Sequence, residues 1–279
     1  MTAMVASPMI GTAGWSIPRE VSDEFPREGS VLSRYAQRFR CVEIDTSFYR
    51  SHRPMTYARW RDSVPSGFRF AVKLPKAISH AKRLVDVEPE WRTFLEETSE
   101  LGSCRGPLLL QLPPSFAFDP TTVERFFALV RVAYSGDFVV EPRHSSWFVD
   151  AFPALLRQYH MSHVIADPPL GPVTSNPPRD VNYFRLHGSP KVYYSGYDPA
   201  QLDKLGRRLS EVAGRCWVIF DNTASGAAAG NALQLMARLS GPTNMCKPSP
   251  ADDARSEPSA GRDEYQKAGQ RLLTGRDFY

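Results

Sequence analysis

The chain has few cysteines, and their arrangement excludes several kinds of site. Four cysteines occur in 279 residues, and no two of them form a C-x-x-C pair: Cys41, Cys104, Cys216 and Cys246. A zinc knuckle or a disulfide framework needs paired or regularly spaced cysteines, so this pattern argues against both. Sparse, scattered cysteines are typical of a reducing compartment, and we expect a cytoplasmic protein.

Long apolar runs are missing as well. No run approaches the roughly 18 apolar residues that a membrane helix needs, so we expect no membrane association. Residues 1–10 contain neither a basic residue nor a long apolar core, which argues against a signal peptide. The net charge of +4 is spread along the chain. It permits a phosphate-bearing ligand, nucleic acid included, without requiring one.

The chain does contain a regular alternation of β-rich and helical segments. The expected strands lie at residues 9–15, 41–49, 69–75, 107–113, the start of 137–147, 162–167, 181–188 and 216–222. Helical patterns are expected at residues 31–39, from Pro54 onward, and at 90–101, 121–133, 149–159, 199–212 and 226–239. This alternation predicts parallel strands with helical crossovers, and eight such units fit a (β/α)8 barrel of the TIM type. A doubly wound open sheet is the alternative, although its central strands rarely carry so many charges.

The composition divides the chain into three parts. Residues 1–8 form a lead-in, residues 9–240 form the single barrel domain, and residues 241–279 form a polar tail rich in Pro, Ser, Asp and Arg. Such a tail buries too little apolar surface to fold, so we expect it to be mostly disordered. Five prolines at residues 168–178 predict a loop after the sixth strand.

Polar residues recur in the last third of seven of the eight expected strands. Every second residue of a barrel strand points inward, and the more apolar set must face the helices. The inward set is then Glu43, Asp45, Lys73, Gln111, Glu141, Arg143, Asp167, Arg185 and His187. In the eighth strand the choice between Asp221 and Asn222 stays open. Barrel active sites lie at the carboxyl ends of the strands, so a functional pocket is favoured over a structural salt network.

The residue types suggest acid–base chemistry. Glu141 with Glu43 or Asp45 is a candidate acid–base pair whose pKa values are separated by mutual repulsion. His187 and His144 are candidate general bases or metal ligands. His52 and His80 lie in expected loops and receive no role.

The basic residues suggest anion binding. Arg143, Arg185 and Lys73 are suited to a phosphate or a carboxylate. The remaining candidates for ligand contact are Gln111, Asp167, Asp221, Asn222, His144, Trp147, Tyr49 and Trp15. Trp15, Tyr49, Trp147 and the tyrosines at 193, 194 and 197 are placed to rim the mouth and stack on a sugar or base. Aromatic residues at the ends of elements also often simply pack, and that alternative stays open.

The sequence assigns no cofactor. A divalent metal held by Glu141, His187, Asp167 and Glu43 is chemically reasonable. No H-x-x-x-H or H-x-H pair supports it, so a metal site is not favoured.

Five motifs carry a resemblance to a known family. They are residues 11–15 (GTAGW), 43–49 (EIDTSFY), 141–147 (EPRHSSW), 183–188 (YFRLHG) and 220–222 (FDN), with Gly226 and Asn231 following. In this order they resemble the YecE-like family, the domain of unknown function numbered seventy-two, over about residues 9–240. The resemblance implies a TIM-type barrel and no agreed reaction. Its motif positions map onto Glu141, Arg143, His144, Trp147, Arg185, His187 and Gly188.

The chain departs from the pattern of that family at two positions. Asp45 and Asp221 stand where Asn is usual, which adds negative charge to the mouth. A purely anion-binding pocket is thereby less favoured, and a bound cation becomes more plausible.

These observations predict an enzyme that performs acid–base chemistry on a phosphorylated or polyhydroxylated small molecule at the carboxyl end of the barrel. Hydrolase, lyase and isomerase reactions all stay open, as does the oligomeric state. The alternatives are a metal-assisted phosphodiester hydrolase acting on nucleic acid, which rests on analogy with other barrels, and a non-catalytic barrel that binds anions or sugars.

Overall fold

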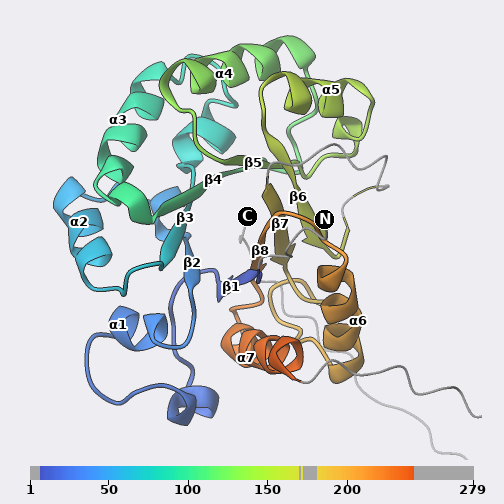
Figure 1. The fold of residues 1–279 in the computed structure, drawn as a ribbon. Helices are drawn as coiled ribbons and strands as arrows, with labels where there is room; N and C mark the ends of the chain where they lie inside the picture. The colour runs from blue at the N-terminus through green and yellow to red at the C-terminus, as the bar shows by residue number, and fades with distance from the viewer. Residues whose placement is uncertain (1–6, 170, 172–180, 242–279) are drawn as a thin grey trace, which may run out of the picture. The chain divides into compact units, whose positions relative to one another are not determined.

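The computed structural model describes residues 7–169, 171 and 181–241. Eight parallel strands form the centre of this part of the chain (Figure 1). They are β1 (Met9–Thr12), β2 (Cys41–Ile44), β3 (Arg69–Lys73), β4 (Arg105–Gln111), β5 (Phe138–Glu141), β6 (Ser162–Asp167), β7 (Val181–Leu186) and β8 (Arg215–Phe220). Hydrogen bonds join them in the order β1-β8-β7-β6-β5-β4-β3-β2. The predicted (β/α)8 barrel is confirmed.

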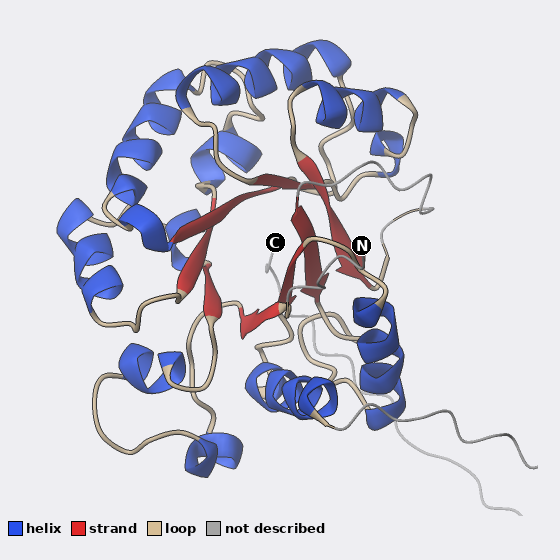
Figure 2. Cartoon of the chain, in the orientation of Figure 1, coloured by secondary structure: helices blue, strands red, loops and turns tan. Residues whose placement is uncertain are grey.

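Helices surround the strands (Figure 2). The α-helices are α1 (Val31–Ala36), α2 (Pro54–Asp62), α3 (Glu88–Ser99), α4 (Pro120–Ala133), α5 (Ala151–Gln158), α6 (Pro199–Ser210) and α7 (Ala227–Ser240). Shorter 3-10 or π turns, which the sequence did not predict, are η1 (Arg19–Glu24), η2 (Thr46–Phe48), η3 (Ala77–Ala81), η4 (Gly102–Cys104) and η5 (Ser145–Trp147). Most of the loop expected at 168–178 and nearly all of the tail expected at 241–279 lie outside the described residues.

The barrel closes between β1 and β2 through a short contact. Ala13 and Glu43 form an isolated parallel bridge, and the Gly14 amide donates to the Glu43 carbonyl oxygen at 2.8 Å. A Cβ atom at Gly11 would lie 2.1 Å from the carbonyl oxygen of Cys41. Only glycine lets the two strands approach this closely.

Alternating side chains of the strands build two separate cores. Val42 and Ile44 of β2 face the helices and belong to the outer core, whereas Cys41 faces the barrel interior. The interior is filled by Cys41, Ala71, Leu109, Val139, Val164, Val181, Tyr183, Trp217 and Ile219. Fully burying a large apolar side chain stabilises a fold by about 1.5–3 kcal/mol, so both cores contribute substantially.

The interior residues that follow this apolar plug along the strands are polar. Glu43 comes two residues after Cys41 in β2, and Arg185 comes two residues after Tyr183 in β7. The same parity extends to His187 and, in β8, from Ile219 to Asp221. The carboxyl ends of the strands therefore direct polar side chains into one region, and the open choice in β8 is resolved in favour of Asp221. Within the described residues, no helix has the length and apolar character needed to cross a bilayer.

Candidate functional site

Arg185, near the end of β7, is fully buried at the centre of a polar cluster. Its Nη1 donates to Glu141 Oε2 at 2.9 Å and to Gln111 Oε1 at 3.2 Å. Its Nη2 and Nε donate to the Glu43 carboxylate at 2.7 and 3.1 Å, and Nη2 lies 3.1 Å from Asp221 Oδ2. These acceptors compensate for the hydration that a buried guanidinium loses. All three nitrogens are engaged by the protein, so Arg185 holds the acids in place and is not available to a ligand.

The residues deepest in the cluster form a closed hydrogen-bonded set. The Tyr183 hydroxyl donates to Glu43 Oε2 at 2.7 Å, beside the two contacts from Arg185. Burial raises the pKa of the Glu43 carboxyl, although Arg185 opposes the rise. Burial also raises the pKa of the Tyr183 hydroxyl, so it stays protonated as a donor. We call Glu43, Gln111, Tyr183 and Arg185 the inner layer.

His187 lies between two carboxylates. Its Nε2 is 2.8 Å from Glu141 Oε1 and its Nδ1 is 2.9 Å from Asp221 Oδ2. Burial disfavours the charged ring, but Glu141 and the hydrogen bond to Asp221 raise the pKa of His187 above its usual value. With an acceptor at each nitrogen, the ring is best satisfied as the imidazolium, which donates from both.

A third group competes for the same ring nitrogen. Arg143 Nη2 lies 3.0 Å from His187 Nε2 and 2.8 Å from Glu141 Oε1. A guanidinium can only donate, so its contact with Nε2 is favourable when that nitrogen carries no proton. His187 therefore has a partner at Nε2 in either protonation state: Glu141 for the charged ring and Arg143 for the neutral one.

The two acids that hold His187 are themselves kept ionised. Burial alone would raise the pKa of Glu141, but Arg143, Arg185 and His187 hold it well below its usual range. The pKa of Asp221 falls to about 2, because Arg185 and His187 outweigh the effect of its burial. Both carboxylates are charged at neutral pH and act as fixed acceptors.

A more exposed pair lies on the β2–β3 side of the cluster. Lys73 Nζ is 2.9 Å from Asp45 Oδ1 and 4.4 Å from the centre of the Phe48 ring. Lys73 is 7% exposed at its side chain and Asp45 is 28% exposed. The inward direction predicted for Lys73 agrees with its burial. We call Asp45, Lys73, Arg143 and His187 the outer layer.

Tyr193 covers His187 from the loop after β7. The two rings are 5.6 Å apart and nearly perpendicular, and the Tyr193 amide donates to the His187 carbonyl oxygen at 2.6 Å. Tyr193 has a φ of +69°, a conformation that costs a non-glycine residue about 1–3 kcal/mol. Burial raises the pKa of its hydroxyl, with opposing effects from Arg143 and Asp221. The hydroxyl therefore lies within the field of the charged cluster.

Two asparagines fasten this loop to the barrel. Asn222 Nδ2 donates to the carbonyl oxygen of Ser195 and to Asn231 Oδ1, each at 3.0 Å, and Asn231 also exchanges two hydrogen bonds with the backbone of Tyr197. The Tyr197 hydroxyl accepts from the Gly188 amide at 2.9 Å. Asn222, which was predicted to contact ligand, thus positions the loop, and its Oδ1 has no hydrogen-bond partner among the described residues.

The predicted inward direction of Asp167 is wrong. Val164 belongs to the barrel interior, whereas Ile165 packs against the outer core. Asp167 shares the parity of Ile165 and is directed away from the polar cluster. Its backbone still contacts the site, because its carbonyl oxygen accepts from the amide of His187 at 2.7 Å.

Four further predicted residues lie outside the cluster. His144 caps η5, where its Nδ1 accepts from the Ser146 amide at 3.2 Å. Trp147 is fully buried in the outer core and donates from Nε1 to a backbone carbonyl at 2.7 Å. Trp15 packs edge to face on a second tryptophan at 5.0 Å, and Tyr49 is 70% exposed. Trp15 and Trp147 therefore pack against the protein, which is the alternative to ligand stacking that the sequence left open.

The geometry gives no support to the metal that the sequence left open. Among residues 7–169, 171 and 181–241, no three His, Cys, Asp or Glu side chains are grouped as metal ligands would be. Asp167 is directed elsewhere, and a cation at Glu43 or Glu141 would have to displace the Arg185 guanidinium.

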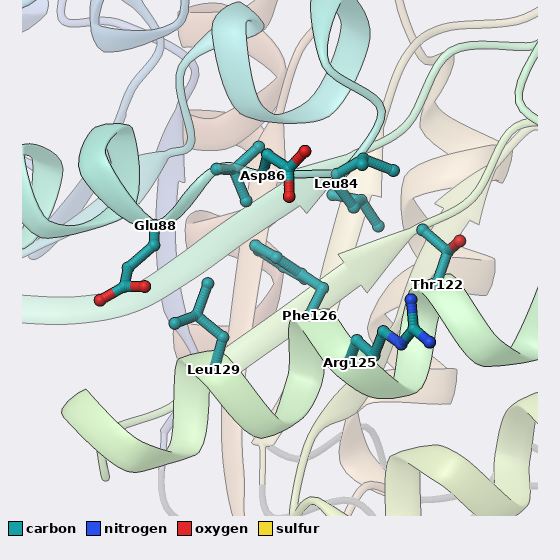
Figure 3. Close-up of a pocket in the computed structure, with 9 residues that line it drawn as sticks. Leu84, Asp86, Glu88, Thr122, Arg125, Phe126 and Leu129 are labelled. Carbon is teal, nitrogen blue, oxygen red and sulfur yellow. The ribbon is translucent and has the colours of Figure 1, made fainter.

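A separate pocket of about 230 Å³ lies on the outer side of the barrel (Figure 3). It opens between the segment that precedes α3 and one face of α4, and none of the cluster residues lines it. The residues that line it are Leu84, Val85, Asp86, Val87, Glu88, Thr122, Arg125, Phe126 and Leu129.

Sequence reasoning missed three residues beside the cluster. Tyr183 shares the parity of Arg185, so the same alternation would have identified it. Tyr193 was considered only as part of an aromatic rim, and His80 was given no role. His80 lies 4.9 Å from the Phe48 ring that Lys73 also contacts. Tyr193 and His80 reach the site from turns, and no simple sequence pattern predicts the conformation of these turns.

Comparison with known proteins identifies relatives of the chain. It is 37% identical over 108 residues to the UPF0759 protein YecE of Escherichia coli strain K12. That match spans 38% of this chain and 38% of YecE. A crystal structure of a DUF72 family protein from Enterococcus faecalis V583 matches with a TM-score of 0.72 at 22% identity, covering 88% of this chain and all of the other.

A more distant solved structure shares the fold. It is described as a sugar phosphate isomerase/epimerase from Parabacteroides distasonis, with a TM-score of 0.52 and 10% identity over 87% of this chain and 99% of that one. The family model for the protein of unknown function DUF72 matches residues 9–255. The resemblance seen in the five motifs is thereby confirmed, and the chain belongs to the DUF72 family.

Proposed function

We propose that this protein is an enzyme that transfers a proton to or from a polyhydroxylated or phosphorylated small molecule, with His187 as the acid–base group. One observation carries the proposal: Glu141 and Arg143 both reach Nε2 of His187, at 2.8 and 3.0 Å. One is an acceptor and the other a donor, so the nitrogen has a partner with or without its proton. A purely structural histidine needs only one of them.

The arrangement supports a simple proton cycle. The charged ring donates to Glu141 through Nε2 and to Asp221 through Nδ1. When Nε2 gives its proton to a substrate atom, Arg143 donates to that nitrogen. The Nδ1 proton stays on the ring, and its hydrogen bond to Asp221 keeps the ring oriented. Holding both protonation states in one geometry lowers the reorganisation that accompanies each transfer.

The mixed charge of the outer layer suits a substrate that carries both hydroxyl and anionic groups. Carboxylates such as Asp45 accept from hydroxyls, and Lys73 and Arg143 donate to a phosphate or a developing oxyanion. A structural neighbour is described as a sugar phosphate isomerase/epimerase. At 10% identity that likeness concerns the barrel, so the proposal rests on the side chains of this chain.

Substrate access requires a loop movement. His187 is 1% exposed and is covered by Arg143 and Tyr193, which follow β5 and β7. A substrate reaches Nε2 after the Tyr193 ring moves aside, which leaves Arg143 in place beside the nitrogen. Closure of such groups over a bound substrate is a common way to exclude water from the reacting atoms.

The test is the isosteric substitution Glu141→Gln, assayed on a panel of sugars, polyols and their phosphates in D₂O. Turnover is read by NMR as exchange of carbon-bound hydrogen or as product formation. The variant keeps the size of the side chain but weakens the acceptor for His187, so we expect turnover to fall by about 10²–10⁴-fold.

Glu124→Gln on the exposed face of α4 is the matched control and should retain full turnover. Circular dichroism checks that both variants are folded. Undiminished turnover in a folded Glu141→Gln variant would refute the proposed acid–base role.

A further inference from the structure

A group of mostly cationic side chains includes two residues of the outer layer and extends from them to the turn that follows β3. We call it the basic cluster: Lys73, Lys76, His80, Arg83 and Arg143. His80 belongs to η3, the π turn that follows β3, and the proposed acid–base chemistry does not use it.

Direct contacts hold two members of the basic cluster around one aromatic ring. Lys73 Nζ lies 4.4 Å from the centre of the Phe48 ring, and the His80 ring packs edge to face on Phe48 at 4.9 Å. His80 Nδ1 is fixed by Ser79 Oγ at 2.9 Å. The imidazole is therefore held on the same support as the Lys73 ammonium, with Nε2 left for another partner.

The electrostatic field at His80 is positive. Burial lowers the pKa of His80, and Lys73, Lys76, Arg143 and Arg83 lower it further, to about 4. Arg143 follows β5, yet it lowers the pKa of His80, which follows β3. The basic cluster therefore contains residues from two separate turns at the barrel mouth.

The positive charge of the cluster is only partly compensated. Lys73 is paired with Asp45, and Arg143 with Glu141. Lys76 and Arg83 form no ion pair with any acid in the described ranges. The buried Nε of Arg143 likewise finds no hydrogen-bond acceptor there. An unused guanidinium donor beside uncompensated cations is the arrangement that an anion would complete.

We propose that the basic cluster is the subsite for the phosphate group of a small phosphomonoester, held by Arg143, His80 and Lys76. The proposal rests on the acid–base function of His187 and names the part of the substrate that the protein recognises. Lys73 and Arg83, whose guanidinium donates to Ser115, add positive charge that acts on His80.

The position of Arg143 links this subsite to the reacting atoms. Nε and Nη2 share one edge of a guanidinium, and Nη2 of Arg143 touches both Glu141 and His187. A phosphate bound at Nε therefore lies next to the proton-transfer group. This favours a short substrate whose reacting carbon or hydroxyl is a few bonds from its phosphate.

The experiment is a titration of the full-length protein with inorganic phosphate, followed by calorimetry and by NMR of the histidine rings. His80→Gln identifies the His80 signal and keeps a partner for Ser79. We expect phosphate to raise the pKa of His80 from about 4 because a bound anion favours the charged ring.

Each variant should change the affinity for phosphate by a different factor. His80→Gln should weaken phosphate binding about tenfold, as for loss of one charge-assisted hydrogen bond. Lys76→Gln changes an exposed side chain and should weaken it about threefold. Lys82→Gln is the matched control, since Lys82 is committed to Glu90 and to the backbone of Asp86; its phosphate affinity should be unchanged.

Phosphate affinity that is equal in the wild type, His80→Gln and Lys76→Gln would overturn the subsite. Tighter binding of a dinucleotide phosphodiester than of phosphate would overturn the assignment to a monoester. Neither result depends on turnover, so each is distinguishable from failure of the Glu141→Gln test. An unphosphorylated substrate that turns over normally would leave the acid–base role intact while removing the subsite.

Discussion

The inner and outer layers of the polar cluster contain similar residue types but differ in how completely they are satisfied. In the inner layer every nitrogen of Arg185 has an acceptor, and Glu43 accepts from both Arg185 and Tyr183. In the outer layer Arg143 has an unused Nε, and His187 has two competing partners at one nitrogen. Complete pairing fixes a structure, whereas incomplete pairing leaves groups that a substrate can use.

The sequence left two interpretations of the inward charges, a structural salt network and a functional pocket, and each fits a different layer of the polar cluster. The structural salt network describes the inner layer, where the acids and the base satisfy one another. The functional pocket is the interpretation that we propose for the outer layer and the basic cluster. Glu141 and Asp221 connect the two layers, since each contacts Arg185 as well as His187. The inner layer therefore sets the positions of the acids that act on His187.

The largest expected effect tests the structural role of the inner layer. Arg185→Met leaves Glu43 buried without its cation, so the free energy of unfolding should fall by about 3–5 kcal/mol. Arg61→Met removes an exposed partner of Asp62, and because solvent screens such a pair the loss of stability should be much smaller. Urea denaturation followed by circular dichroism measures both. Equal losses in the two variants would contradict the structural role assigned to the inner layer.

The pH dependence of stability separates two histidines of the mouth. The pKa of His187 is raised in the folded state, so its contribution is full below the unfolded value of about 6.5 and is lost as pH rises through the folded value. The pKa of His80 is lowered to about 4, so stability falls as pH drops from about 6.5 toward 4.

Denaturation curves between pH 4 and pH 8, in roughly half-unit steps, provide the measurement. His187→Gln should flatten the alkaline side of the stability profile, and His80→Gln should flatten the acid side. His160→Asn serves as a control, because this ring is exposed after α5 and asparagine tolerates the positive φ of the position. A profile that His80→Gln leaves unchanged below pH 6 would contradict the positive field assigned to the basic cluster.

The smallest expected effect tests the outer layer. Lys73→Met keeps an apolar stem on Phe48 but removes the partner of Asp45, which is partly exposed. We expect a loss of about 1 kcal/mol or less in stability, together with a clear rise in KM for a phosphorylated substrate. A stability loss as large as that of Arg185→Met, with KM unchanged, would move Lys73 into the inner layer.

The fold and most of the inward residues could be predicted because strand alternation is a local property. In β2 the apolar Val42 and Ile44 alternate with Glu43, so burial on the helix side decides the parity. In β6 both sets contain apolar residues, Val164 and Ala166 against Ile165. The pattern was therefore ambiguous there, and Asp167 was assigned to the wrong face.

The parts of the site that were not predicted come from turns. His144 and Trp147 follow a strand end rich in charge, yet local capping and outer-core packing use them instead. His80 and Tyr193 reach the cluster through a π turn and a residue with positive φ. Neither conformation is dictated by periodicity, because it depends on contacts with distant residues such as Phe48 and Ala224.

Glu43 joins β1 to β2 with its main chain and binds Arg185 with its side chain. The line between these two strands is held by a single bridge, so it is where local opening of the barrel should begin. Neutralising the Glu43 carboxylate would weaken its ion pair with Arg185 of β7. Because the main chain of the same residue forms the bridge to β1, the contact between β1 and β2 would weaken as well. The rate at which the Gly14 amide exchanges with solvent deuterium thus becomes a distant reporter of the charge inside the barrel.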